Sequence, residues 1–198
     1  MLGFRLKHFN WHNSKGLYIV FISLLTLGFL FSQISQSPVY SASRPEELIN
    51  KSAPLFVITS IDGEKIDLNK LNKVILIDFW ATWCGPCKEI TPTITALDKA
   101  YSEQGLFVLG IAVNDSLDSI KKYIKDNKVS YPIVASTSKG DTPLTKIAQD
   151  YGVRAIPTLI LIDKHGTVRY TFVGVSRNQA KFQEELDILI SELLKEDI

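Results

Sequence analysis

Apolar and polar residues follow one another in blocks along the chain, and each block predicts one element. Continuous apolar runs at 74–80 and 106–113 are typical of strands that are buried on both faces of a sheet. Asp62-Gly63, between two short apolar stretches, predicts the turn of a hairpin over 55–68. Shorter apolar runs predict further strands at 132–135, 158–162 and 167–173. Apolar side chains recurring every three or four residues predict four helices, at 86–101, 116–128, 142–151 and 176–195.

This order of elements predicts the fold class. Strands alternate with helices, and a hairpin and a helix close the chain, which is typical of an α/β fold with a mixed central sheet flanked by helices. Ser116 is expected to cap the helix that follows it, and Gly152 suits the position just after the helix that ends at 151.

The first 43 residues differ from the rest, because residues 17–34 are mainly Leu, Ile, Phe and Val and follow a basic, acid-free start. That length is at the lower end of what spans a bilayer, and the positive-inside rule leaves residues 1–15 in the cytoplasm. We therefore expect an anchor at 16–34, a linker at 35–52 and a domain at 53–198 outside the cytoplasm. A signal peptide cleaved near 39–43, giving a secreted form, is the alternative, and it places the domain on the same side.

Charge and cysteine content exclude several classes of partner and site. The 198 residues carry 22 basic and 21 acidic side chains, so nothing indicates binding to nucleic acid. The two cysteines, Cys84 and Cys87, form a single C-x-x-C motif. The domain must therefore be held together by its core and not by structural disulfides.

The C-x-x-C motif lies where a predicted strand meets a predicted helix. Two thiols separated by Gly85-Pro86 can alternate between dithiol and disulfide, and the second thiol can resolve a mixed disulfide. Amide N–H groups at a helix start favour a thiolate on Cys84, and Pro86 suits the first helical turn. A zinc site would need four ligands, whereas the chain adds only three histidines, two of which precede the apolar run. We therefore expect a redox-active Cys84–Cys87 couple with no metal and no other cofactor.

Asp78 interrupts the apolar run before the motif. A carboxylate buried there without a partner would have a raised pKa, as a proton-transferring group often does. The alternative is a solvated acid at the end of the strand, with no part in the chemistry.

Two segments resemble the thioredoxin family. Residues 78–88, Asp-Phe-Trp-Ala-Thr-Trp-Cys-Gly-Pro-Cys-Lys, are similar to its active-site signature, and Ala155-Ile156-Pro157-Thr158 is similar to its cis-proline segment. The opening from Ala53 resembles more specifically the membrane-anchored TlpA/ResA-like branch, also called AhpC/TSA-like. The resemblance covers roughly residues 53–194 and implies a thioredoxin-like fold with a central helix–strand insertion between residues 114 and 157.

The resemblance also implies a role for each site residue. Cys84 would be the exposed nucleophile, Cys87 would resolve the mixed disulfide, and Asp78 would take the proton of Cys87. The family's lysine partner to this acid falls at Ala112, so Asp78 is expected to lack a cation. Trp83 is expected to be core-packed and also to cover the site. The residues expected to shape the substrate groove are Trp83, Gly85, Pro86, Ile156 and a cis Pro157.

By this resemblance the protein is a thiol-disulfide oxidoreductase, and the Cys-Gly-Pro-Cys sequence favours a reductant of protein disulfides. Its electrons would come from a membrane thiol donor, and its soluble domain would be monomeric. Cytochrome c maturation is one context in which the branch works, but the Glu expected three residues after the second cysteine is Ile90 here. A disulfide oxidant or isomerase, and a tethered binding or metal-carrier module without turnover, are the alternatives.

Overall fold

The structure, a computed structural model, describes residues 44–135, 142–176 and 178–196. The predicted anchor or signal peptide and the first half of the predicted linker, residues 35–43, lie outside these residues. Within the described part of the chain, no helix is long and apolar enough to cross a membrane.

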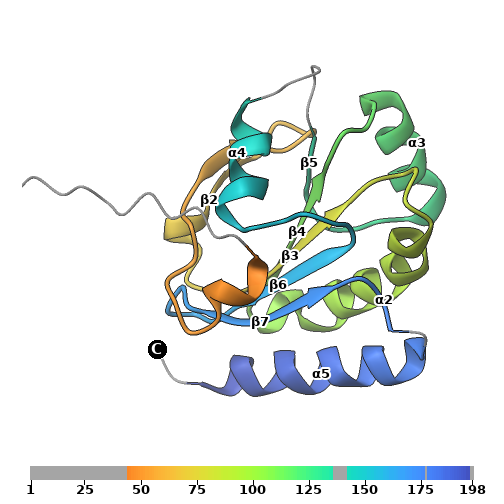
Figure 1. The fold of residues 1–198 in the computed structure, drawn as a ribbon. Coiled ribbons are helices and arrows are strands. Elements are labelled where there is room, and N and C mark those ends of the chain that lie inside the picture. Colours follow the sequence, from red (N-terminus) through yellow and green to blue (C-terminus); the bar gives the residue numbers. More distant parts are fainter. Residues whose placement is uncertain (1–43, 136–141, 177, 197–198) are drawn as a thin grey trace, which may run out of the picture. The chain divides into compact units, whose positions relative to one another are not determined.

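A five-stranded mixed sheet forms the centre of the domain, in the order β5-β4-β3-β6-β7 (Figure 1). Strands β3, β4 and β5 are parallel, whereas β6 is antiparallel to both β3 and β7. The strands span Val74–Trp80 (β3), Leu106–Ala112 (β4), Ile133–Ala135 (β5), Thr158–Ile162 (β6) and Val168–Val173 (β7). The α/β class with a mixed sheet is thus confirmed.

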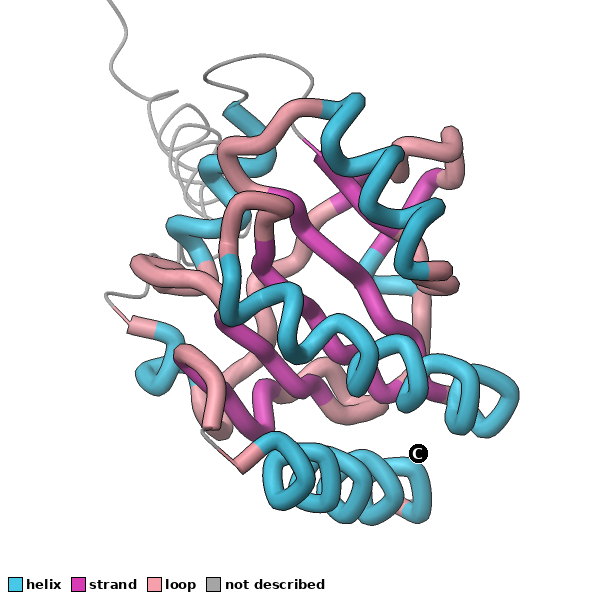
Figure 2. Tube along the Cα trace, turned by 90° about the vertical axis from the view of Figure 1, so that its right-hand side faces the viewer, coloured by secondary structure: helices cyan, strands magenta, loops and turns pink. Residues whose placement is uncertain are grey.

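Helices and a small hairpin cover the two faces of this sheet. One face carries α2 (Gly85–Tyr101), α3 (Leu117–Asn127) and α5 (Gln179–Lys195), and Figure 2 shows helices crossing in front of the strands. The other face is packed against α4 (Thr142–Asp150), the 3₁₀ helix η2 (Pro45–Leu48) and the hairpin of β1 (Val57–Thr59) and β2 (Lys65–Asp67). Short 3₁₀ turns follow β2 and α2, at Leu68–Lys70 (η3) and Ser102–Gln104 (η4).

The strands and helices predicted within residues 53–198 are present, most with boundaries within one residue of the prediction, and two larger differences have a physical reason. The domain begins before residue 53, because Pro45 and Leu48 of η2 are buried and the Asn50 N–H donates to the carbonyl of Val168. The last helix begins at Gln179 and not at 176, because the side chain of Asn178 caps it by accepting from the Lys181 N–H. The predicted cap of α3 is confirmed, since the Ser116 hydroxyl accepts from the Ser119 N–H.

Strand β3 is buried along its whole length, and its alternation divides the core in two. Val74, Leu76 and Trp80 contribute to the layer beneath α2, which also contains both cysteines. The alternate residues Ile75, Ile77 and Phe79 contribute to the layer on the other face. Side chains alternate between the two faces along a strand, so Asp78, two residues before Trp80, lies on the α2 side.

Gly110 in β4 lies directly opposite Asp78 in β3 and leaves room for large side chains. A Cβ atom there would lie 3.1 Å from Trp80 Nε1, 3.2 Å from Tyr131 Cε2 and closer still to Ile133 Cδ1. All three neighbours belong to the core layer beneath α2, so none can move freely into solvent.

Gly110→Ala is therefore expected to lower the free energy of unfolding by about 1–3 kcal/mol, as overpacking of a filled core does. Urea denaturation would measure this as a fall in the midpoint. Gly85→Ala is a matched control, because a Cβ at Gly85 has no atom within 4 Å. Equal midpoints for the two variants would contradict this account of Gly110.

Candidate active site

The two cysteines lie at the start of α2, immediately after the loop that follows β3. Cys84 is the N-cap of this helix, and its Sγ accepts a hydrogen bond from the Cys87 N–H at 3.2 Å. The thiols are joined in a disulfide, with their Cα atoms 5.3 Å apart. In the dithiol form, the N–H groups of this first helical turn would favour negative charge on the Cys84 sulfur.

The two cysteine residues differ slightly in their exposure to solvent. Cys84 is 6% exposed and Cys87 1% exposed, while Gly85 and Pro86 between them are exposed. Cys84 is therefore the more accessible of the pair, but the description of it as exposed is wrong.

Asp78 lies in the core on the same side of the sheet as the disulfide, and it is only 1% exposed. Burial raises the pKa of this carboxyl to about 8. Its Oδ1 atom has no hydrogen-bond partner among the described residues, and burial alone accounts for the raised pKa. Ala112, where the family's lysine was expected, lies opposite Trp80 in the sheet. The prediction that this acid is buried is confirmed, and a solvated acid at the end of the strand is excluded.

Trp80 and Tyr131 place two more polar groups near this acid. Trp80 Nε1 is buried without a partner among the described residues, and Tyr131 is 4% exposed. Burial raises the pKa of the Tyr131 hydroxyl, and the negative charge of Asp78 raises it further. The sequence indicated only packing for Trp80 and did not single out Tyr131, because the proximity depends on the glycine at 110, which a linear pattern does not show.

The loop after β4 contacts the loop that carries Cys84. Trp83 Nε1 donates to the carbonyl of Asn114 at 2.9 Å. Trp83 is nevertheless 60% exposed, so the expectation that it is core-packed is wrong. Asp115, next in this loop, accepts hydrogen bonds from the N–H groups of Thr82 and Ser116. These loop residues were missed, although an Asn-Asp pair directly after a buried parallel strand is a signal, because such loops commonly line sites in α/β folds.

The cis-proline segment lies at the same edge of the sheet. The Ile156-Pro157 peptide bond is cis, as expected, and Pro157 is buried. Thr158, the next residue, pairs with Phe79 near the end of β3. The Gly174 N–H donates to the carbonyl of Pro157 at 2.8 Å, and the adjacent Val173 is 50% exposed. The fold thus brings the two sequence segments, some 70 residues apart, to one edge.

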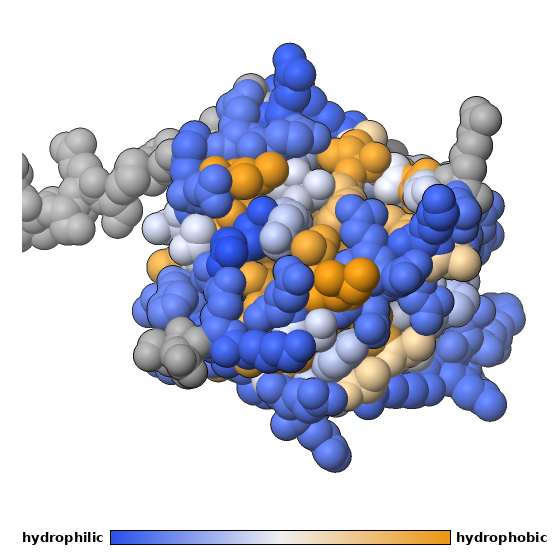
Figure 3. Space-filling view, turned by 90° about the horizontal axis from the view of Figure 1, so that it is seen from below, coloured by the Kyte–Doolittle hydropathy of each residue, from blue (hydrophilic) through white to orange (hydrophobic). Residues whose placement is uncertain are grey.

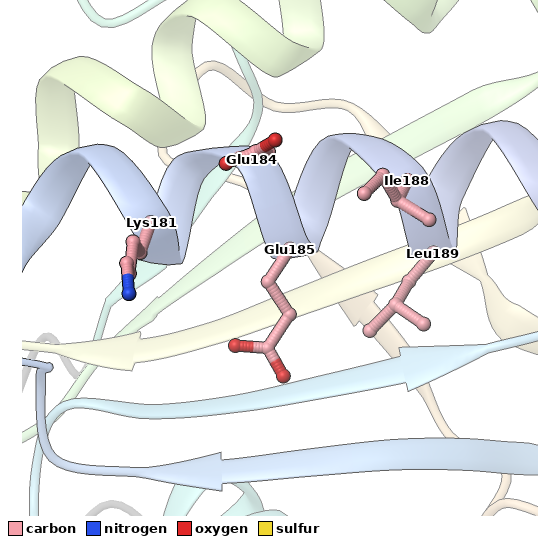
Figure 4. Close-up of a pocket in the computed structure, with 5 residues that line it drawn as sticks. All are labelled: Lys181, Glu184, Glu185, Ile188 and Leu189. Atoms are coloured by element: carbon pink, nitrogen blue, oxygen red, sulfur yellow. The ribbon is translucent and has the colours of Figure 1, made fainter.

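A surface pocket lies elsewhere, on the outer side of α5. Figure 3 views the domain from the α5 side and shows apolar patches separated by hydrophilic residues. The five side chains that line the pocket all project from this one helix, as Figure 4 shows: Lys181, Glu184, Glu185, Ile188 and Leu189. None of them is a predicted site residue. Among residues 44–135, 142–176 and 178–196, no three His, Cys, Asp or Glu side chains lie so as to hold a metal ion.

The raised pKa of Asp78 makes stability depend on pH. A folded-state pKa of about 8, above the ordinary value of 3.8, means that the native state holds this proton more tightly than the unfolded state. The stabilisation is complete below the unfolded pKa and is lost as pH rises through the folded one. Asp78→Asn cannot ionise, so we expect it to gain stability relative to wild type between about pH 5 and about pH 9.

Urea midpoints at the two pH values measure this gain, with the exposed Asp62→Asn as the control. An identical offset between wild type and Asp78→Asn at both pH values would contradict the burial of an ionisable carboxyl.

Comparisons with known proteins agree with this geometry. The sequence profile of the AhpC/TSA family matches residues 49–171. The chain is 32% identical over 159 residues to thiol-disulfide oxidoreductase ResA of Bacillus cereus, covering 80% of this chain and 87% of that protein. Among solved structures, a putative thiol:disulfide interchange protein DsbE from Chlorobium tepidum matches with a TM-score of 0.62 and 27% identity, covering 74% of this chain and 97% of that one. A thioredoxin family protein of the same organism matches with a TM-score of 0.61 and 30% identity, covering 72% and 95%. The chain therefore belongs to the AhpC/TSA family and is a ResA-like thiol-disulfide oxidoreductase.

Proposed function

We propose that this protein is an extracytoplasmic reductant of protein disulfides, with Cys84 as nucleophile, Cys87 as resolving thiol and Asp78 as the proton-transferring group. The observation that carries the proposal is the arrangement of these three residues. The disulfide lies at the start of α2, with Cys84 the more exposed of its two residues. On the same side of the sheet lies a buried acid whose Oδ1 has no hydrogen-bond partner among the described residues. The couple needs no other cofactor, because the two sulfurs themselves carry the electrons.

The reaction starts from the reduced form of the pair. The Cys84 thiolate attacks one sulfur of the substrate disulfide, which forms a mixed disulfide and releases the first substrate thiolate. Cys87 then gives up its proton, and its thiolate attacks Cys84 Sγ. The Cys84–Cys87 bond forms and the second substrate thiolate leaves. Two electrons pass from the dithiol to the substrate, whose two thiolates take up protons.

Asp78 suits the role of proton acceptor by its environment. Cys87 is 1% exposed, so water has little access to remove its proton. A carboxyl with a pKa of about 8 is a stronger base than an ordinary one, and it exchanges protons near neutral pH. Burial on the α2 side of β3 directs this base toward the layer that contains Cys87.

The substrate would bind over the exposed residues around Cys84. Trp83, Gly85 and Pro86 are exposed, and Val173 beside the cis-proline segment is half exposed. Backbone groups of Ile156 and the cis Pro157 line the same edge of the sheet and would pair with an extended substrate. An apolar surface beside the nucleophile suits a protein disulfide better than a small charged one.

The proposed location of the domain and the proposed direction of electron flow rest on the sequence. The apolar run at 17–34 and the basic residues before it favour a domain tethered outside the cytoplasm, where a membrane dithiol donor would have to regenerate the reduced pair. The domain would act as a monomer, and cytochrome c maturation is one setting in which such a reductant works. Oxidation or isomerisation of disulfides, or binding without turnover, are the competing functions.

The reduction potential of the pair separates these functions. We expect the full chain, purified in a mild detergent and equilibrated in defined redox buffers, to show one two-electron transition near about −270 mV by thiol alkylation. A transition near about −120 mV would make the protein an oxidant. Cys84→Ser and Cys87→Ser are controls that should show no transition, and its absence in wild type would leave only the binding module.

Asp78→Asn is expected to slow resolution of the mixed disulfide by about 10²-fold, because an amide cannot take the Cys87 proton. Single-turnover reduction of insulin by the pre-reduced chain measures this rate. The reduction potential should change far less, since the base acts on the transition state of the step. Asp62→Asn provides the control, and a wild-type rate in Asp78→Asn across about pH 6–9 would eliminate Asp78 as the base.

A further inference from the structure

The side chain of Asp115 contacts the turn that presents Cys84 from the neighbouring loop. The Cys84 N–H donates to the carbonyl of Ala81 at 3.2 Å, which closes a tight turn after β3. The Thr82 N–H inside this turn donates to Asp115 Oδ2, and the Ser116 N–H donates to Oδ1 of the same side chain at 2.8 Å. One carboxylate oxygen of Asp115 therefore accepts from the turn before α2, and the other accepts from the loop that contains Asp115 itself.

The second loop is itself firmly placed. The Val113 N–H donates to the carbonyl of Trp80 at 2.9 Å, so the chain leaves β4 beside the end of β3. Asn114 has a φ of +50°, a left-handed conformation that asparagine adopts readily. Ser116 is the N-cap of α3. Asp115 thus ties the nucleophile's turn to the start of a packed helix.

Trp83 depends on the same junction. Its side chain is 60% exposed, so core packing contributes little to fixing its orientation. The bond from Nε1 to the carbonyl of Asn114, at 2.9 Å, holds the indole, and the residues on either side of Trp83 are held by Asp115 and by the turn. An aromatic ring already fixed in its binding orientation loses little entropy when a partner docks on it.

We propose that Asp115 is a positioning residue that holds the Thr82–Cys84 turn against the loop after β4, so that Trp83 is presented in a fixed orientation to a protein disulfide. The inference rests on the proposed function and adds a determinant of substrate preference to it. Asp115 itself transfers no proton or electron. Its effect is on docking of a protein surface beside Cys84, and a small disulfide that does not reach Trp83 is indifferent to it.

The test compares a protein disulfide with a small one. The pre-reduced full chain, in a mild detergent, is mixed with excess insulin or with oxidised glutathione, and single-turnover rates are measured against concentration. For Asp115→Ala we expect the half-saturating insulin concentration to rise about tenfold, the effect of losing a charge-assisted hydrogen bond. The saturating rate and the rate with glutathione should stay within about twofold of wild type.

Two further variants make the result specific. Asp115→Asn keeps one acceptor oxygen and should recover part of the loss. Asp118→Ala removes an exposed acid three residues away, in the first turn of α3, and should match wild type. Hydrogen exchange of the peptide containing Thr82 should be faster in Asp115→Ala than in Asp118→Ala, since its amide loses its acceptor.

The outcomes are distinguishable. Wild-type insulin kinetics in Asp115→Ala, or an equal loss with insulin and glutathione, would overturn the positioning role while the proposed function stands. Failure of the pre-reduced wild-type chain to reduce insulin at all would instead remove the proposed function. If Asp115→Ala does not fold, Asp115→Asn still decides, because a variant that folds and matches wild type on insulin contradicts the proposal.

Discussion

Burial of β3 on both faces is the constraint on which the other features of this domain depend. All seven residues of the strand are buried, although one of them is an acid. The other six residues of the strand are apolar and contribute to the core layers on its two faces. Hydrogen bonds along both sides of the strand fix it between β4 and β6. A strand held in this way determines where the chain emerges, and it emerges directly into the turn that carries Cys84.

The same burial sets the electrostatics of the site. Burial raises the pKa of Asp78 to about 8, and its Oδ1 has no hydrogen-bond partner in the part of the chain that the structure describes. The adjacent strand accommodates it with a glycine, so that Trp80 and Tyr131 fill the space opposite. The fold therefore keeps an acid, at a local cost in stability, on the side of the sheet whose core layer also contains both cysteines.

Where β3 and β4 end, loops from distant parts of the sequence meet. The turn before α2, the loop after β4 and the cis-proline segment are joined by hydrogen bonds to backbone groups or by strand pairing. Main-chain groups take part in each of these contacts, and Trp83 remains 60% exposed although its Nε1 makes one of them.

The sequence by itself determined the elements, the α/β class and the redox pair, because hydrophobic periodicity and the C-x-x-C spacing are local properties. It also favoured a buried Asp78, because the neighbouring residues of the strand are apolar, but it left a solvated acid at the strand end as an alternative. Only the tertiary structure decided that Trp83 is exposed, that Cys84 is largely covered, and that Tyr131 and Asp115 lie beside the site. These features depend on which residues distant strands and loops bring together across the sheet edge. The pattern of residues along the chain does not show this proximity, because the proximity arises from the register of β3 with β4 and β6.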